Sequence, residues 1–324
     1  MAEGRAARLA VAVAAPASLL LLVVALAWPD LGRPVHNTIE AIRIACAQSM
    51  VAGGHWLVPR TWGEPYIFKP PGLPWVIALA GLAAGRVDER LARLAVALFS
   101  GGLTALLWAL SRRPLGDRRA WLACLILVSG YDFAHRAAYA LIDLPLMLAL
   151  GAAAWAFHRG LLEPEGERRW FAATHALGAL AALLKGPLAL AVLAAAVLPM
   201  AAAGGRPRAA WRLLARPATL LWLLPAAWYG AVLAGGGEAA RSLLSTELTQ
   251  QITGRNEQEP VTYYLGSLAS HFLPWGWLLP LTAAAAWRRH RRLALTLAAW
   301  AAATFLLFSL AEEKTHRYLM PLYP

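Results

Sequence analysis

Charged residues are scarce in this chain of 324 residues: they make up 15% of it, whereas 59% of the residues are hydrophobic. A soluble domain has about a quarter charged residues, so the composition excludes an ordinary soluble fold. Cysteine is scarcer still, since only Cys46 and Cys124 occur and they lie in different segments. That number and spacing exclude a disulfide framework and a cysteine-rich metal site.

Long apolar runs account for most of the chain, as in Leu9–Trp28, Pro217–Leu233 and Leu293–Leu310. At 1.5 Å per residue, runs of this length cross the hydrocarbon core of a bilayer, which is about 30 Å thick. The first run follows the basic segment Met1–Arg8, but it is too long for a signal peptide and no clear small-residue cleavage site ends it. The sequence therefore predicts an all-α, polytopic integral membrane protein with a retained first helix.

Lysine is nearly missing, although the net charge is +12. The arginines form short islands between the apolar runs, a spacing that follows the positive-inside rule and argues against nucleic-acid binding. These islands are Arg112–Arg119, Arg159–Arg169, Arg206–Arg216 and Arg288–Arg292. Positive charge in this chain is therefore expected to set membrane topology, with the islands on the cytoplasmic side.

The islands and the apolar runs together predict about ten crossings. Leu73–Ala84 is too short to span and would place the next island outside, so we expect it to lie half-buried at the outer interface. The expected crossings are Leu9–Trp28, Leu91–Leu110, Trp121–Tyr131, Leu144–Phe157, Phe171–Leu184, Leu188–Ala203, Pro217–Leu233, Tyr263–Trp287 and Leu293–Leu310, and a tenth begins at Tyr318. Because the chain stops at Pro324, this pattern predicts that the C-terminal part of a longer protein is missing.

Five segments are then external, and they hold nearly all the residues that could perform chemistry. They are Pro29–Arg90, Asp132–Asp143, Lys185–Pro187, Ala234–Thr262 and Ala311–Arg317. In the first, Thr38–Met50 is predicted to be an amphipathic helix that Thr38 caps and Gly53-Gly54 ends. Its apolar face would comprise Ile39, Ile42, Cys46 and Met50.

Two external carboxylates are candidate functional groups. Asp143 lies in "AYALIDLPLML", at the outer mouth of an apolar helix, where an ionisable residue is costly and indicates function. A carboxylate at a helix N-terminus also favours the helix dipole, so a purely structural role remains open. Glu40 lies in the first turn of the external helix, where glutamate is ordinary.

The three lysines, Lys69, Lys185 and Lys314, all lie in external segments close to a membrane boundary. Lys69 stands in "EPYIFKPPGLPW", before two prolines and among aromatic residues. A compact ammonium can bind a phosphate as a point charge, so converging lysines suggest an anionic lipid headgroup. The alternative is that each lysine extends from a loop to water.

Five segments carry a family resemblance, in the order in which the family has them. They are "EAIRIACAQSMVAGGHWLVPRTWGEPYIFKPPGLPW", "RAAYALIDLPLML", "GALAALLKGPLAL", "YYLGSLASHFLPW" and "EEKTHRYLMPLYP". Together they resemble the bacterial GT-C glycosyltransferases, in the branch of the lipid A aminoarabinose transferases and the protein O-mannosyltransferases. The resemblance covers the chain from about Glu40 to Pro324.

The resemblance implies a single GT-C transmembrane domain over residues 1–324, with a periplasmic loop at 29–90 that carries interfacial helices. It implies transfer of a sugar from a polyprenyl-phosphate donor to a lipid, glycan or protein acceptor, at the periplasmic face of a bacterial inner membrane. The residues indicate no cofactor, and the lack of a histidine in Ala234–Thr262, where the family often has one that can hold a metal, predicts no structural metal. The arginine spacing predicts no nucleic-acid partner. The residues that the resemblance assigns are Glu40 and Asp143 to catalysis, and Lys69, Tyr66, Lys185, Tyr318 and Arg255 to the donor phosphate.

Departures from the family pattern leave alternatives open. The family has an aspartate where this chain has Ile39, so either Glu40 or Asp143 takes over its role or the activity is altered. Phe68 replaces a glutamate before Lys69, and His55 replaces the aspartate of a Gly-Asp-Trp motif. A catalytically silent member, or a transporter or flippase for an anionic lipid, would use the same external cations. The chain lacks the internal repeats that are typical of transporters.

Overall fold

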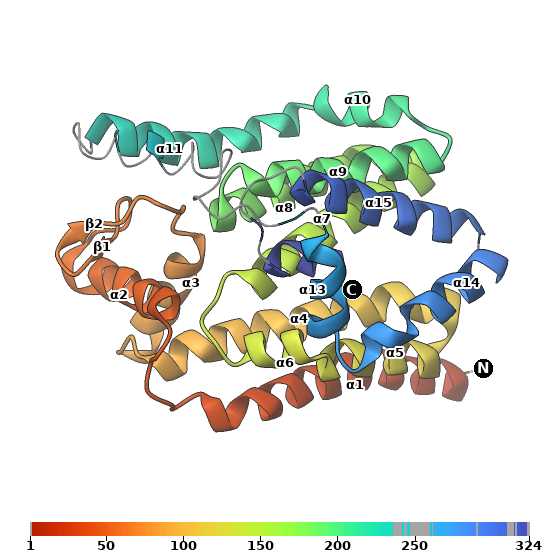
Figure 1. Ribbon diagram of the computed structural model, residues 1–324, viewed down its shortest axis with the longest axis horizontal. Helices are drawn as coiled ribbons and strands as arrows, with labels where there is room; N and C mark the ends of the chain where they lie inside the picture. Colours follow the sequence, from red (N-terminus) through yellow and green to blue (C-terminus); the bar gives the residue numbers. More distant parts are fainter. Residues whose placement is uncertain are drawn as a thin grey trace. The chain divides into compact units, whose positions relative to one another are not determined.

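The computed structural model describes residues 2–235, 242, 245–246, 260, 262–289, 291–309, 314 and 316–322. The described chain is helical apart from one short antiparallel pair of strands (Figure 1). By packing it divides into two compact units. The first unit comprises residues 1–54 and 73–148 with residue 324, and the second comprises residues 55–72 and 149–323.

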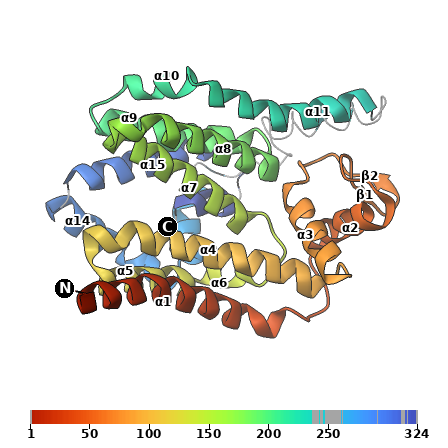
Figure 2. The same ribbon diagram turned by 180° about the vertical axis from the view of Figure 1, so that it is seen from behind.

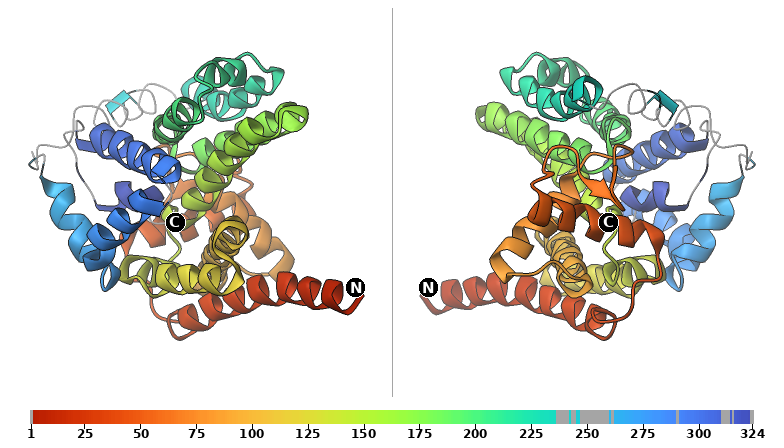
Figure 3. Two further views of the ribbon diagram at one scale, coloured as in Figure 1. Left: turned by 90° about the vertical axis from the view of Figure 1, so that its right-hand side faces the viewer. Right: turned by 90° about the vertical axis from the view of Figure 1, so that its left-hand side faces the viewer.

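The first unit consists of helices. Its elements are α1 (Ala2–Ala27), η1 (Trp28–Asp30), α2 (Thr38–Gly53), α3 (Gly72–Ala84), α4 (Glu89–Leu115), α5 (Asp117–Ser129), α6 (Tyr131–Ala137) and the start of α7 (Asp143–Leu162). Helix α4 packs along both α1 and α5 (Figures 2 and 3). Gly101 of α4 permits this approach, because a Cβ at that position would collide with the Leu20 side chain of α1.

Asn37 caps helix α2. Its Oδ1 accepts hydrogen bonds from the backbone N–H of Ile39 at 2.9 Å and of Glu40 at 3.4 Å. The prediction that Thr38 is the cap is wrong by one residue, because Asn37 has the extended conformation of a cap and Thr38 is already helical. The predicted C-terminal stop is confirmed, since Gly54 has a positive φ of 69°.

The buried face of α2 differs in part from the predicted one. Cys46 and Met50 are buried as expected, but Ile39 is 36% exposed and does not belong to that face. Polar residues take its place, because Glu40 and Arg43 are buried. A buried glutamate needs a partner of opposite charge, so the burial of Glu40 is the first indication of a site in this unit.

The second unit holds the remaining elements. They are β1 (Arg60–Thr61), β2 (Glu64–Pro65), the rest of α7, η2 (Pro164–Gly166), α8 (Glu167–Lys185), α9 (Leu188–Ala203), α10 (Arg208–Leu214), η3 (Pro217–Trp222), α11 (Leu223–Gly235), α13 (Tyr263–His271), η4 (Trp275–Leu278), α14 (Leu279–Arg289), α15 (Arg291–Ser309) and η5 (His316–Leu322). Helix α9 packs between α8 and α15 (Figure 1). The Lys-Gly-Pro segment forms the tight turn between α8 and α9.

Among the described residues, three helical segments are long and apolar enough to cross a membrane by length and composition: Glu89–Leu115, Asp143–Leu162 and Pro217–Ala234. Helix α3 has 13 residues, so the expected short helix over residues 73–84 is confirmed, while its interfacial position stays a prediction. The prediction that Tyr263–Trp287 is one continuous crossing helix is wrong. Residues 263–287 form α13, η4 and α14, and Pro274, which has no N–H to donate, lies at the break.

Candidate functional site

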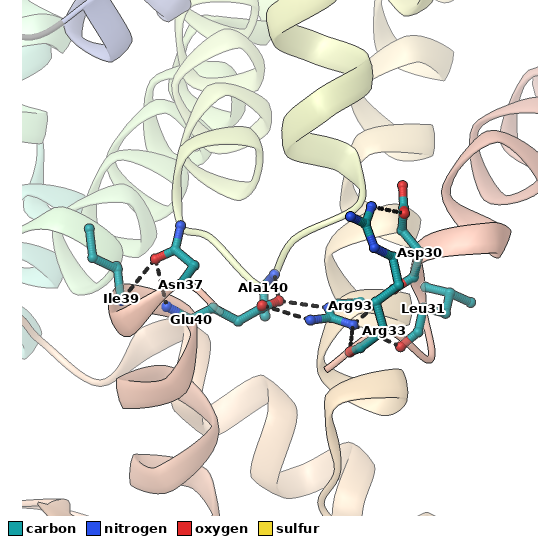
Figure 4. Close-up of polar contacts among 8 residues, drawn as sticks. All are labelled: Asp30, Leu31, Arg33, Asn37, Ile39, Glu40, Arg93 and Ala140. Atoms are coloured by element: carbon teal, nitrogen blue, oxygen red, sulfur yellow. Dashed lines mark hydrogen bonds and ion pairs between the residues drawn. The ribbon is translucent and has the colours of Figure 1, made fainter. Parts of the chain in front are cut away.

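Glu40 is fully buried, and hydrogen bonds hold both of its carboxylate oxygens (Figure 4). Arg93 of α4 donates from Nε to Oε1 and from Nη2 to Oε2, each at 2.8 Å. The backbone N–H of Ala140 also donates to Oε1, at 2.8 Å. This paired geometry is the strong form of a carboxylate–guanidinium contact.

Arg93 extends the contact to the end of the first helix. Its Nη1 donates to the backbone carbonyls of Asp30 at 2.8 Å, Leu31 at 3.2 Å and Arg33 at 2.5 Å. One guanidinium therefore joins α2, α4 and the chain that follows α1. Sequence reasoning missed Arg93, although a charged residue inside an apolar helix is a signal of this kind.

Asp143 belongs to a second buried ion-pair group in the same unit. It is 4% exposed, and its Oδ2 accepts from Arg136 Nη1 at 3.1 Å. Arg136 also donates from Nε to Asp132 Oδ1 at 2.8 Å, so one arginine serves two carboxylates. Sequence reasoning missed Asp132 and Arg136. Their four-residue spacing, which puts them on one face of a helix, is the signal that could have indicated the ion pair.

We call Glu40, Arg93, Asp132, Arg136 and Asp143 the acidic cluster. It contains three carboxylates and two guanidinium groups, which form two sets of buried ion pairs. Both predicted catalytic residues therefore lie in buried ion pairs of the first unit. A positioned carboxylate suits a hydroxyl that must lose a proton.

Ile39 adds no carboxylate to this cluster. Its side chain points away from the Glu40 carboxylate (Figure 4). Nearby, Arg33 pairs with Asp30, and this hydrogen bond and charge raise the pKa of Arg33 above its ordinary value. Arg33 therefore stays protonated and paired with Asp30 over the accessible pH range.

In the second unit, Lys185 and Tyr318 lie together. Lys185 ends α8 and is 8% exposed, and its Nζ is 5.1 Å from the centroid of the Tyr318 ring. Gly186 follows with a φ of 79°, and a Cβ there would collide with the Tyr229 hydroxyl. The Lys-Gly-Pro turn is therefore close-packed around a cation and two tyrosines.

The segment that holds Lys69 packs against this same turn. The position of a Cβ on Gly186 would lie 3.9 Å from Pro70 Cδ, and one on Gly72 would lie 2.6 Å from the Leu183 carbonyl oxygen. Tyr66 is buried just before Lys69, and its ring lies 5.6 Å from that of Phe68. The residues that follow Lys69 and Lys185 in sequence are thus neighbours in space.

The remaining predicted phosphate ligand, Arg255, lies outside the described residues. Among the described residues, no group of three or more His, Cys, Asp or Glu side chains could hold a metal ion. The phosphate-binding candidates that the structure places are therefore Lys69, Tyr66, Lys185 and Tyr318. They all belong to the second unit, whereas Glu40 and Asp143 belong to the first.

Comparison with known families gives a match over half of the chain. The family described as "Dolichyl-phosphate-mannose-protein mannosyltransferase" matches residues 68–229. This range includes Lys69, Asp143 and Lys185. It therefore covers one of the two candidate catalytic residues and both candidate phosphate-binding lysines.

Characterised relatives are similar over nearly the whole chain. The undecaprenyl phosphate-alpha-4-amino-4-deoxy-L-arabinose arabinosyl transferase of Edwardsiella ictaluri is 31% identical over 304 residues, which are 90% of this chain and 54% of the relative. The corresponding protein of Pseudomonas aeruginosa is 31% identical over 288 residues, 85% of this chain and 51% of its own length. The chain thus spans about half the length of the curated relatives that it matches.

Two solved structures resemble the fold. The crystal structure of ArnT from Cupriavidus metallidurans bound to undecaprenyl phosphate matches with a TM-score of 0.80 and 25% identity, over 95% of this chain and 57% of that one. The archaeal oligosaccharyltransferase AglB from Archaeoglobus fulgidus matches with a TM-score of 0.56 and 13% identity, over 96% of this chain and 49% of that one. At that identity the second likeness shows the fold alone.

Proposed function

Because the chain belongs to the dolichyl-phosphate-mannose-protein mannosyltransferase family of GT-C glycosyltransferases, we propose that it takes part in sugar transfer from a polyprenyl-phosphate donor. The acceptor is a lipid, glycan or protein at the periplasmic face of a bacterial inner membrane. The undecaprenyl phosphate and the amino sugar named for its relatives support an undecaprenyl-phosphate donor.

The observation that carries this proposal is the packing of two lysine segments against each other in the second unit. Pro70 and Gly72 lie against the turn formed by Leu183 to Gly186, and this packing supports one phosphate site for Lys69 and Lys185. In the proposed reaction Lys69 and Lys185 bind the donor phosphate, assisted by Tyr66, Tyr318 and Arg255. Cations placed where the leaving phosphate gains charge stabilise the transition state.

Asp143 is the proposed reacting carboxylate. It accepts the proton of the acceptor hydroxyl as the hydroxyl oxygen bonds to the anomeric carbon and the bond between that carbon and the phosphate oxygen breaks. The leaving group is polyprenyl phosphate, and displacement from the opposite side inverts the anomeric centre. Arg136 holds the Asp143 carboxylate in place at 3.1 Å. Glu40 contributes to the same cluster through its contact with the segment before Asp143.

A catalytically silent protein is the second candidate function. The exposed Ile39 favours it, because the family pattern has a catalytic aspartate at that place. A silent protein would still bind the donor through the lysines of the second unit. Binding without turnover is therefore its distinguishing property.

The test compares a strain that carries the chromosomal gene with a deletion strain. Mass spectrometry of membrane glycolipids and glycoproteins is expected to show one glycosylated product lost and the lipid-linked donor accumulated. Complementation by Asp143→Asn should fail. Complementation by Asp117→Asn should succeed, because Asp117 is a half-exposed carboxylate that pairs only with Arg112 among the described contacts. Identical spectra from both strains would overturn the transferase proposal.

A further inference from the structure

We propose that Glu40 is a positioning residue: with Arg93 it clamps the segment 138–142, and this segment sets the place of Asp143. The inference rests on the proposed function, because it assigns Glu40 a role in support of the reacting carboxylate. The inference gives different roles to Glu40 and Asp143, which the family resemblance assigns together to catalysis. Asp143 meets the substrate, and Glu40 acts through the backbone.

The contacts of Glu40 favour this role over proton transfer. A general base must have an oxygen within hydrogen-bonding reach of the substrate proton. The Oε1 atom of Glu40 accepts from both Arg93 Nε and the Ala140 N–H, and its Oε2 accepts from Arg93 Nη2. The side chain is fully buried, so a substrate would have to displace these donors to reach it.

The segment 138–142 is the object of the clamp. It joins α6 to α7 without helical structure, and Ala140 is buried at its midpoint. The residues that flank the segment are joined by a hydrogen bond, which Arg136 Nη1 donates to Asp143 Oδ2 at 3.1 Å. Inside it, the Leu141 N–H donates to the Tyr139 carbonyl at 2.8 Å. The Ala140 N–H lies outside any helix, and Glu40 is its acceptor at 2.8 Å.

Arg93 makes the clamp rigid. The three carbonyls after α1 that it contacts anchor its guanidinium, which in turn fixes the Glu40 carboxylate. The hydrogen bond to Ala140 therefore ties the segment before Asp143 to the framework of α2 and α4. A displacement of about 1 Å at a reacting group can lower a rate by about a hundredfold, so such a tie is directly relevant to catalysis.

Substitutions of similar size separate positioning from chemistry. Glu40→Gln keeps one acceptor oxygen for the Ala140 N–H, whereas Glu40→Met keeps none. The double variant Glu40→Met/Arg93→Met removes both charges together, so that neither partner of the pair is left as an unpaired buried charge. The measurements on full-length protein in nanodiscs are kcat, the KM for undecaprenyl-phosphate sugar, the pH–rate profile, and hydrogen exchange over residues 138–142.

The positioning role predicts that Glu40→Gln keeps kcat within about tenfold of the wild type and retains its pH–rate profile, because the group that exchanges a proton is unchanged. The double methionine variant should lose about a hundredfold in kcat at unchanged KM, with faster exchange over 138–142. The role is overturned if Glu40→Gln is as inactive as Asp143→Asn while exchange over 138–142 stays slow. If the wild-type protein shows no turnover, the proposed function is refuted, but the clamp is not. Exchange that is equal in the wild type and the double variant would refute the clamp.

Discussion

At the scale of single residues, position 39 carries the main departure from the family pattern. Ile39 is 36% exposed in the first turn of α2, so Ile39→Asp places a carboxylate in solvent near the positive end of the helix dipole, where it is stabilising. We expect the variant to keep or raise the transfer rate, with no loss of thermal stability. Initial rates with an undecaprenyl-phosphate sugar check this.

Val51→Asp is the matched control, because Val51 is 37% exposed at the other end of the same helix. It adds the same charge without occupying the family position, and no gain in rate is expected. A lower rate in Ile39→Asp than in Val51→Asp would contradict the idea that position 39 is compatible with a catalytic carboxylate.

Lys69 tests the proposed phosphate site. A charge contact of this kind that is shielded from water is worth about 2–5 kcal/mol, so Lys69→Ala should raise the Kd for undecaprenyl phosphate by about one to a few powers of ten. Lys69→Arg should rescue only part of the loss, because a planar guanidinium replaces a compact ammonium. Binding in nanodiscs measures both.

Arg60→Ala provides the control for a cation in the same loop. Arg60 is exposed and donates to the Gly63 carbonyl, so its loss should leave donor affinity unchanged. Wild-type affinity in Lys69→Ala would mean that this lysine extends to water and does not bind the phosphate.

At the scale of elements, the α8–α9 turn depends on Gly186. Its φ of 79° is strained for any other residue, and an added Cβ would also meet the Tyr229 hydroxyl. Gly186→Ala should therefore destabilise the protein by about 1–3 kcal/mol and weaken donor binding, since the displaced turn carries Lys185. Thermal unfolding and donor titration measure the two effects.

Gly205→Ala separates strain from displacement. Gly205 also has a positive φ, of 67°, but nothing lies within 4 Å of an added Cβ. The Gly205→Ala variant should therefore have a lower free energy of unfolding than the wild type and an unchanged affinity for the donor. Equal donor affinity in the two variants would show that the turn does not position a phosphate ligand.

At the scale of the whole molecule, the charge islands predict which ends of the helices face the cytoplasm. Leu115→Cys, within the island Arg112–Arg119, should resist a membrane-impermeant maleimide in intact spheroplasts, whereas Leu57→Cys in the first loop should react. Both native cysteines are fully buried. Burial also raises the pKa of the Cys46 thiol to about 12, so only about one molecule in ten thousand or fewer carries the thiolate near neutral pH.

Labelling of Leu115→Cys from the periplasm would overturn the topology and the interfacial position of α3. Labelling after permeabilisation confirms that the engineered cysteine is accessible. Reaction of the wild type under the same conditions would show that Cys46 of α2 or Cys124 of α5 does not keep its buried position.

The sequence by itself determined the features that depend on neighbouring residues. Apolar runs predicted α4, α9 and α15 closely, the Lys-Gly-Pro motif predicted the α8–α9 turn, and Gly53-Gly54 predicted the end of α2. Ordered motifs identified the family and both candidate carboxylates. These inferences succeed because hydrophobic period, chain stiffness and motif spacing act over a few residues.

Only the tertiary structure decided which side chains meet. Glu40 pairs with Arg93, 53 residues away, and with the Ala140 N–H, 100 residues away, and no local pattern specifies either partner. Its burial follows from packing between helices that are distant in sequence. A carboxylate that local sequence presents as ordinary thereby becomes the fixed end of a clamp, because a buried charge is stable only where the fold supplies its partners.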